Sequence, residues 1–379
     1  MVSTVRVSVS PPVLSWAVQR TGLSSEELEK KFPQLLKWQS GDAQPTLKQA
    51  KELARAAHIP FGRLLLEQPS GDEVGVSDFR TLRNAEVVDA SPNLQDTIFA
   101  NQNRLGWYSE FAAEEGIEPP SLFGSIPEGT SARAAAQSVR CELGLKESSP
   151  LPGGDKVREL AALMEGNGIL VARNSIVGNS TRRPLNVEEF RGFTIEDDGF
   201  VLVFVNTRDA KSAQLFSLAH ELGHVVRGRP GISDHSDHEG VERWCNQFAA
   251  EFLAPVEAVV AMHREDDLVA SVNRLSTRFG MSREAMLWRL VELGIVRRDE
   301  AEKLVGLVRS APAKSSEDES GAPPPHVLVR SRVGGLFYDT VTNAAANGQI
   351  PELEAARYLG AKTHESFTKL VSARHREVV

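Results

Sequence analysis

Cysteine is nearly absent from this chain. Only Cys141 and Cys245 occur among 379 residues, far apart and without a CxxC spacing. This excludes a disulfide framework and a zinc knuckle made of cysteines. A metal site would therefore have to be built from histidine and carboxylate side chains.

Long apolar runs are also missing. No stretch approaches the roughly 20 apolar residues that a membrane-spanning helix needs. The first residues, MVSTVRVSVSPPVLSW, contain no continuous apolar core followed by a small-residue cleavage site, so they do not resemble a secretory signal. We therefore expect a cytoplasmic protein that does not enter a membrane. The net charge of −8 argues against nonspecific binding of polyanions by the whole surface.

The length of the chain predicts two or three domains. Residues 1–70 carry apolar residues at three- and four-residue spacing, which predicts a compact helical domain. Ser24 or Ser25 and Thr46 are the expected helix N-caps there. Residues 71–155 are expected to form a helical connector that ends in the first layer of the next domain.

The second half of the chain changes pattern. Within residues 156–309, short runs rich in β-branched and aromatic residues predict a small antiparallel sheet: GILVAR, FRGFTI and FVLVFVN. Residues 310–325 have the composition of a linker, and residues 326–379 predict a small helical C-terminal domain. The expected fold class is therefore α+β and predominantly helical.

The N-terminal domain carries a partial motif. The stretch Trp38–Leu66 resembles the C-terminal half of the XRE-type (Cro/C1-type) helix-turn-helix module. Only FPQLLK, which contains Pro33, precedes Trp38 where that module has its recognition helix. Nine basic against six acidic residues in positions 1–70 allow a weakly basic face. We expect weak DNA binding at most, and a surface that docks a partner regulator or a second copy of the chain.

The clearest chemical motif lies in the run LFSLAHELGHVV. His220 and His224 are four residues apart, so on a helix they lie on one face, one turn from each other. Two neutral imidazoles placed in this way can bind one Zn²⁺. Glu221, about 100° from His220 around the helix, would face the water at the metal as a general base. The pattern predicts hydrolysis of an amide bond.

A catalytic zinc site needs a third protein ligand. Six residues after the second histidine stands Pro230, which excludes the metzincin pattern. His235 and His238, in the loop GISDHSDHEG, are alternatives. Glu242 and Glu251 are the carboxylate candidates, and because they are nine residues apart on one predicted helix they lie on opposite faces.

Glu242 is the predicted third ligand. It shares its helix face with Asn246 and Ala249, whose small side chains would let the two helices approach each other. Cys245 could also approach the metal, although a small buried cysteine at a helix contact needs no such role.

The segment Gly192–Pro255 resembles the ImmA/IrrE metallopeptidases. The resemblance is carried by four runs: FRGFTI, FVLVFVN ending in Asn206, FSLAHELGHVV and ERWCNQFAAEFLAP. It implies a gluzincin-like peptidase domain with Glu242 as the third metal ligand, since this residue precedes the family's F-A-A run at the matching place. It also implies Zn²⁺ as the cofactor, with Mn²⁺ as the alternative.

The resemblance further implies a role. Members of this family cleave a helix-turn-helix repressor or an antitoxin-like partner and so release phage, mobile-element or stress genes, and longer members are found beside toxin–antitoxin loci. We therefore expect an endopeptidase that cleaves a regulatory protein. The alternative is a DNA-binding regulator or antitoxin in which the peptidase fold acts mainly as an interaction or metal-sensing module.

Overall fold

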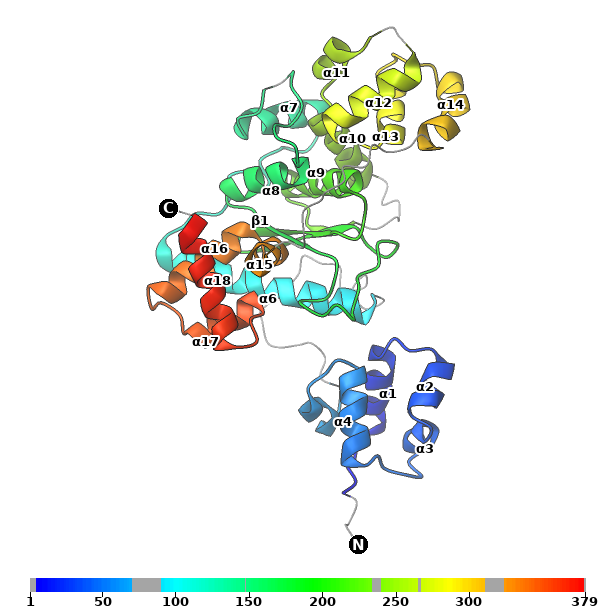
Figure 1. Cartoon of the computed structure of the whole chain (residues 1–379), viewed down its shortest axis with the longest axis vertical. Helices are drawn as coiled ribbons and strands as arrows, with labels where there is room; N and C mark the ends of the chain where they lie inside the picture. The colour runs from blue at the N-terminus through cyan, green and yellow to red at the C-terminus, as the bar shows by residue number, and fades with distance from the viewer. Residues whose placement is uncertain are drawn as a thin grey trace. The chain divides into compact units, whose positions relative to one another are not determined.

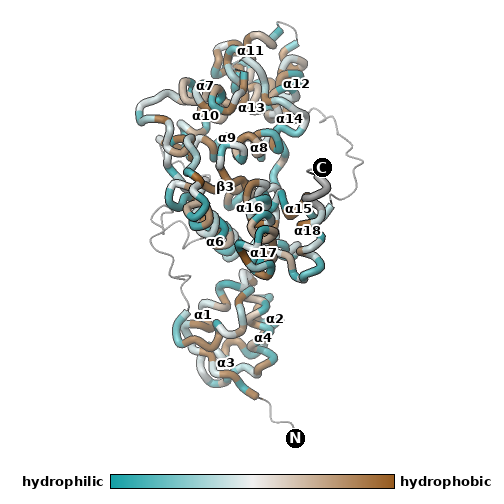
Figure 2. Tube along the Cα trace, turned by 90° about the vertical axis from the view of Figure 1, so that its left-hand side faces the viewer, coloured by the Kyte–Doolittle hydropathy of each residue, from teal (hydrophilic) through white to brown (hydrophobic). Residues whose placement is uncertain are grey.

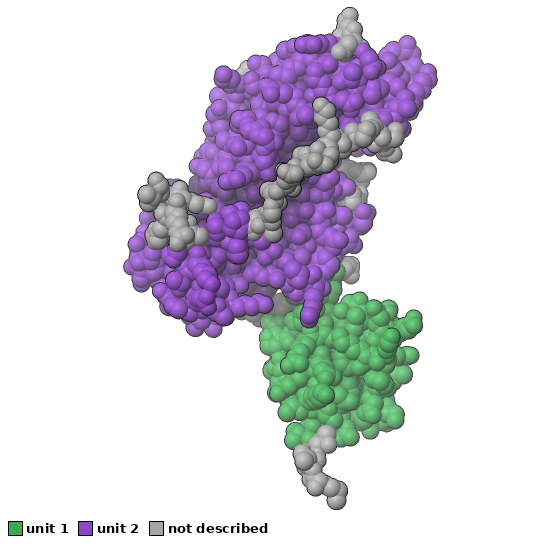
Figure 3. All heavy atoms as spheres, viewed as in Figure 1, with its two compact units in different colours: residues 1–80, 87–96 green, residues 81–86, 97–379 purple. Residues whose placement is uncertain are grey.

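The computed structural model describes residues 5–69, 90–146, 148–233, 240–264, 267–310 and 324–377. It divides into two compact units, residues 1–80 with 87–96 and residues 81–86 with 97–379 (Figure 3). The described residues are predominantly helical and include one small sheet (Figure 1). The predicted α+β fold class is confirmed.

The first unit is a small helical bundle around its own core. Its elements are α1 (Pro11–Arg20), α2 (Ser25–Lys31), α3 (Leu35–Gln39), α4 (Leu47–Ala56) and the 3₁₀ helix η1 (Phe61–Leu65). Both predicted caps are present: Ser24 begins α2 and Thr46 begins α4, each in a capping box with the residue three positions later. Trp38 and Leu53 lie in the buried core. Helix α3 has only five residues, in agreement with the short segment noted before Trp38.

The sheet of the second unit has four strands in the order β1-β3-β2-β4. These strands are β1 (Leu170–Asn174), β2 (Gly192–Asp197), β3 (Phe200–Asn206) and β4 (Gly231–Ser233). Strand β2 is antiparallel to both β3 and β4, and a tight turn at Asp198 and Gly199, both with positive φ, joins it to β3.

One part of the sheet prediction was wrong. Strand β1 pairs with β3 in parallel, so the sheet is mixed and not wholly antiparallel. The sequence predicted three strands but not their order, and β3 lies between β1 and β2. Strand β3 therefore has two neighbours: it runs parallel to β1 and antiparallel to β2.

Helices cover both faces of this sheet. They are α6 (Pro92–Glu115), α8 (Lys156–Gly166) and α9 (Lys211–Arg227), whereas α7 (Ala132–Glu142) packs against α10 (Val241–Leu253). Every residue of β3 is buried, and Val203 packs in one core cluster with Leu218 of α9. On the other face, the ring of Phe200 meets Tyr108 of α6 edge to face, with centroids 5.7 Å apart. Figure 1 shows α8 and α9 on one side of the sheet and α6 on the other, and Figure 2 shows the apolar β3 between them.

The remaining helices follow in two groups. The first comprises α10 (Val241–Leu253), α11 (Val256–Met262), α12 (Leu268–Phe279), α13 (Arg283–Glu292) and α14 (Arg298–Ser310). The second comprises α15 (Pro325–Val333), α16 (Gly335–Ala346), α17 (Glu352–Leu359) and α18 (His364–Glu377). Residues 311–323, most of the predicted linker, lie outside the described residues. Among the described helices, none combines the length and apolar composition that crossing a bilayer requires.

Candidate metal and catalytic site

Helix α9 places both motif histidines on one buried face. It ends at Gly228, which takes the left-handed conformation (φ 59°) and closes the helix one turn after His224. The side chains of His220 and His224 are buried, and their Nε2 atoms lie 3.1 Å apart.

Helix α10 brings Glu242 to the same point. One carboxylate oxygen of Glu242 lies 3.0 Å from Nε2 of His220, and the other lies 3.1 Å from Nε2 of His224. These three residues form a cluster whose ligand atoms all lie within 4.8 Å of one another. The structure therefore brings together the three residues that the sequence predicts as metal ligands.

A glycine allows the two helices to come this close. A Cβ atom added to Gly223, between the two histidines, would lie 3.2 Å from both Sγ of Cys245 and Cδ1 of Phe248 on α10. Such contacts are tighter than most real Cβ atoms make. A larger side chain at Gly223 would push α10 outward and carry Glu242 away from the histidines.

Glu251, the competing candidate, has a different partner. It is buried and forms a salt bridge with Arg289 of α13, and its Oε1 also accepts a hydrogen bond from the backbone N–H of Val256. Both carboxylate oxygens of Glu251 therefore already have partners, on α13 and at the start of α11. Glu242 and Glu251 thus lie on different faces of α10 with different partners, as their nine-residue separation predicts.

The other candidates are placed differently. His235 and His238 lie outside the described residues. Cys245 is fully buried on α10, where burial raises the pKa of its thiol and a hydrogen bond to His224 opposes that rise. It packs against Gly223, which accounts for a small side chain at this position.

Hydrogen bonds at the far side of each ring fix the histidine tautomers. Nδ1 of His224 lies 2.9 Å from the carbonyl oxygen of Arg229, and Nδ1 of His220 lies 3.0 Å from Oδ1 of Asn246. Both partners are oxygen acceptors, so each Nδ1 carries the proton in the neutral ring. The lone pair of each Nε2 then points to the space shared with Glu242, as in proteins that bind metals through histidine.

This arrangement suits a divalent cation. Two imidazole lone pairs and a carboxylate converge, and acceptors alone cannot satisfy one another. Without a metal, the cluster binds protons instead: burial opposes the charged form of His224, but hydrogen bonds to Cys245 and Glu242 raise its pKa well above the ordinary value. Burial would raise the pKa of Glu242, but hydrogen bonds from His220 and His224 lower it to about 2. The donor set, N₂O from two helices, is one that zinc commonly takes.

Glu221 lies on the side of α9 that faces the sheet. It is fully buried, and Oε2 accepts a hydrogen bond of 2.7 Å from the hydroxyl of Thr194 on β2. Its other oxygen, Oε1, is buried with no hydrogen-bond partner among the described residues. A buried carboxylate oxygen in a native protein normally has a partner, so Oε1 is the atom left for a water molecule or a substrate.

Two residues that hold Glu221 were not predicted from the sequence. Thr194 donates the hydrogen bond, and Gly192 makes room, because a Cβ atom there would lie 2.8 Å from Oε1 of Glu221. A signal was present in the strand FRGFTI, where Gly192 and Thr194 are two residues apart and therefore share a face between apolar neighbours. A glycine and a threonine on the buried face of a strand indicate a close polar approach.

The family comparison agrees with this geometry. Residues 169–291, from β1 to α13, match the family model of the peptidase family M78, described as the IrrE N-terminal-like domain. The match covers both helices of the cluster and supports the resemblance to ImmA/IrrE proteins and a metallopeptidase-like role. No curated protein matches the chain.

Proposed function

We propose that this protein is a zinc-dependent endopeptidase in which His220, His224 and Glu242 bind the metal and Glu221 is the general base. The observation that carries the proposal is the convergence of two Nε2 atoms and a carboxylate within 3.0–3.1 Å of one another, beside a buried carboxylate. Mn²⁺ is the alternative ion, because Glu242 supplies a carboxylate oxygen of the kind that Mn²⁺ takes.

The metal would supply Lewis acidity toward a substrate carbonyl and would make water a stronger acid. Glu221 performs the proton transfers. Thr194 fixes Oε2, so Oε1 is held ready to take the proton from the attacking water and then to return it to the nitrogen that leaves. Because the carboxylate is fully buried and oriented, it loses little freedom when it acts.

We further propose that the substrate binds as an extended peptide along the edge of the sheet. Strand β4 forms one edge of the sheet, and Gly231 of β4 is paired with Thr194, the residue that holds Glu221. A substrate segment that adds to β4 as a further strand would be bound by main-chain hydrogen bonds and would pass close to the metal cluster. Such binding requires an unfolded or exposed segment in the substrate.

We propose a small regulatory protein as the substrate: a helix-turn-helix repressor or an antitoxin-like partner. The support is the domain resemblance together with a separate helical N-terminal unit that has its own core and can act as a docking module. The test is to co-express the protein with the small regulator encoded beside its gene and to follow the regulator by mass spectrometry, with and without a chelator.

The matched control is Glu221→Gln. It removes the base but no metal ligand, so we expect the metal content and the fold to be retained and turnover to fall by on the order of 10²–10⁴-fold. Cleavage by this variant at the rate of the wild type would contradict the mechanism. Absence of metal-dependent cleavage of the neighbouring regulator would contradict the proposed substrate.

A further inference from the structure

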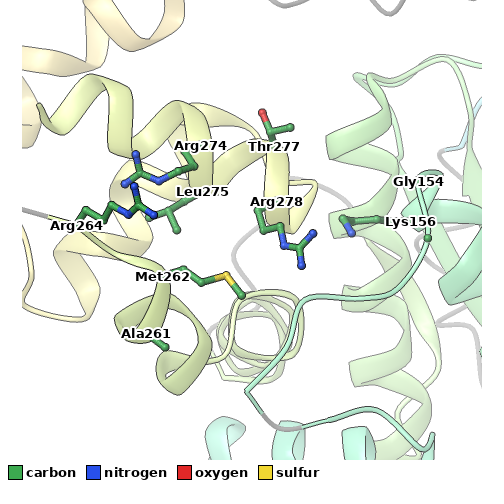
Figure 4. Close-up of a pocket in the computed structure, with 10 residues that line it drawn as sticks. Gly154, Lys156, Ala261, Met262, Arg264, Arg274, Leu275, Thr277 and Arg278 are labelled. Carbon is green, nitrogen blue, oxygen red and sulfur yellow. The ribbon is translucent and has the colours of Figure 1, made fainter. Parts of the chain in front are cut away.

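A basic cavity lies in the second unit, outside the metal cluster. It has a volume of about 680 Å³ and is bounded by the start of α8, the end of α11 and one face of α12. Four cationic side chains line it: Lys156, Arg264, Arg274 and Arg278 (Figure 4). None of the described lining residues is acidic. A volume of this size is typical of sites that bind small molecules.

The cations come from separate elements and meet in one place. Lys156 is the first residue of α8, and Arg278 lies on the last turn of α12, 122 residues later. In Figure 4 the two side chains approach each other from opposite walls. Burial and the positive charge of Arg278 both lower the pKa of Lys156, and Glu159 only partly opposes them. The two cations therefore lie close enough to repel each other.

Helix α12 places like charges on one face. Arg274 and Arg278 are four residues apart, and like charges at this spacing destabilise a helix. Glu159 of α8 acts on Lys156 and raises its pKa, whereas Asp155, the N-cap of α8, is already used: one oxygen accepts a hydrogen bond from the backbone N–H of Arg158, and the other lies 3.2 Å from Lys211. Nζ of Lys156 donates a hydrogen bond of 2.7 Å to the carbonyl oxygen of Leu151, and Arg274 donates one of 3.2 Å to the hydroxyl of Ser271. Neither of these two acceptors carries a charge, so they do not neutralise the cations.

The rest of the lining is suited to an organic group. Met262 and Leu275 give the cavity an apolar surface, and Figure 4 shows Met262 between the Arg264–Arg274 side and the Arg278–Lys156 side. The first turn of α8, with Gly153 and Gly154 before it, adds backbone N–H groups at a helix N-terminus. Such an end favours anions, and arginine forks match phosphate oxygens in pairs.

We propose that this cavity binds a phosphorylated small molecule of about the size of a mononucleotide. Its phosphate lies between Lys156 and Arg278 near the start of α8, and its organic part covers Met262 and Leu275. A nucleic acid strand is disfavoured because the cations line a single hollow and do not follow a stripe along the surface.

The site is in a position to influence the peptidase helix. A Cβ atom added to Gly280, which ends α12, would lie 2.7 Å from Lys156 and 2.9 Å from Leu215 of α9. Helix α9 carries the metal-binding motif, so a ligand that fixes Lys156 and α12 also restrains one side of α9. Binding itself, however, does not depend on peptidase activity and can be measured without a substrate.

The experiment is isothermal titration calorimetry on the full-length protein with inorganic phosphate, pyrophosphate, AMP and adenosine. We expect AMP and pyrophosphate to bind more tightly than phosphate, and adenosine not to bind. Arg278→Gln and Lys156→Gln should each weaken AMP binding by on the order of 10-fold or more, because each removes a charged hydrogen-bond donor. Arg158→Gln is the matched control: Arg158 is exposed on the same helix, two residues from Lys156, and does not line the cavity. It should bind AMP like the wild type.

Several results would overturn the proposal. These are equal binding by wild type and both cavity variants, binding of adenosine as tight as that of AMP, or no probe with a Kd below about 1 mM. A single-stranded oligonucleotide that binds more tightly than AMP, with an affinity that grows with its length, would identify the cavity as part of a nucleic-acid surface and would also refute the small-molecule site. Retained folding of each variant is checked by circular dichroism and by its metal content.

Discussion

The contrast between Glu242 and Glu251 gives the sharpest test of the metal cluster. Both are glutamates of α10, and helix phase separates them. Removing Glu242 takes away one of the three proposed ligands, so Glu242→Ala should weaken metal binding by more than the 10–100-fold that the loss of an outer hydrogen-bond partner causes. Removing Glu251 leaves the metal cluster intact but deprives the buried Arg289 of its partner.

The cost of losing Glu251 can be worked out from its surroundings. Removing one partner of a buried ion pair lowers the free energy of unfolding by about 3–5 kcal/mol. Arg289 keeps hydrogen bonds to the carbonyl of Ala254 and a contact of 2.8 Å with the half-exposed Glu292, so the lower end applies. A loss of about 3 kcal/mol lowers the melting temperature of a unit of this size by roughly 6–12 °C.

The assay combines elemental analysis with thermal unfolding of the metal-free and metal-loaded protein. Glu251→Ala should bind one metal per chain and have a lower melting temperature than the wild type, whereas Glu242→Ala should lose the metal. The double variant Glu251→Met with Arg289→Met replaces the pair by apolar side chains and should recover most of the stability. Loss of metal from Glu251→Ala with an unchanged melting temperature, together with retained metal in Glu242→Ala, would refute the ligand assignment.

Three further predictions concern the base, the protons and the N-terminal unit. Thr194→Val keeps the shape of the side chain but removes the hydrogen bond to Glu221, so kcat should fall by roughly 10-fold at full metal occupancy, and an unchanged kcat would contradict this role. Because hydrogen bonds raise the pKa of His224 well above its ordinary value, the metal-free protein keeps a proton on this ring to higher pH than a free imidazole does, and metal binding should release it. The apparent metal affinity should then rise with pH until the pH passes that pKa, and calorimetry in buffers of different ionisation enthalpy would show the release; no dependence on the buffer would refute it. Residues 1–70 alone should bind DNA weakly and lose the binding as salt rises, since α3 is only five residues long and sequence is read from a helix in the major groove. Nanomolar affinity for the protein's own promoter over an unrelated duplex would favour the regulator instead.

The parts of the site that follow from helix geometry could be predicted from the sequence. Residues four apart on a helix share a face, which brings His220 and His224 together. Helical phase placed Glu242 and Glu251 on opposite faces of α10, and the small neighbours Asn246 and Ala249 together with the family resemblance favoured Glu242. The capping boxes at Ser24 and Thr46 are equally local. In each case the informative residues lie within a few turns of one another.

What depends on tertiary packing could not be predicted in this way. The hydrogen bond from Thr194 to Glu221 joins a strand to a helix, and the pairing of Glu251 with Arg289 joins residues 38 apart on two helices. No periodicity in the sequence relates such residues. The direction of β1 was also wrong because strand order is set by which surfaces bury each other, and β3, with every residue buried, occupies the centre.

The two edge strands of the sheet, β1 and β4, differ in what lies beside them. At the β4 edge we propose that a peptide adds, but at the β1 edge the junction of α15 and α16 fills the approach: a Cβ atom on Gly334 would lie 3.0 Å from the carbonyl oxygen of Val171. Glu165 of α8 secures this junction by accepting hydrogen bonds from the backbone N–H groups of Gly335 and Leu336. An uncovered strand edge is a template for aggregation. Helices α15 and α16 therefore cover the edge of β1, and a shortened chain that ends before Pro324 should self-associate through this edge even though it retains His220, His224 and Glu242.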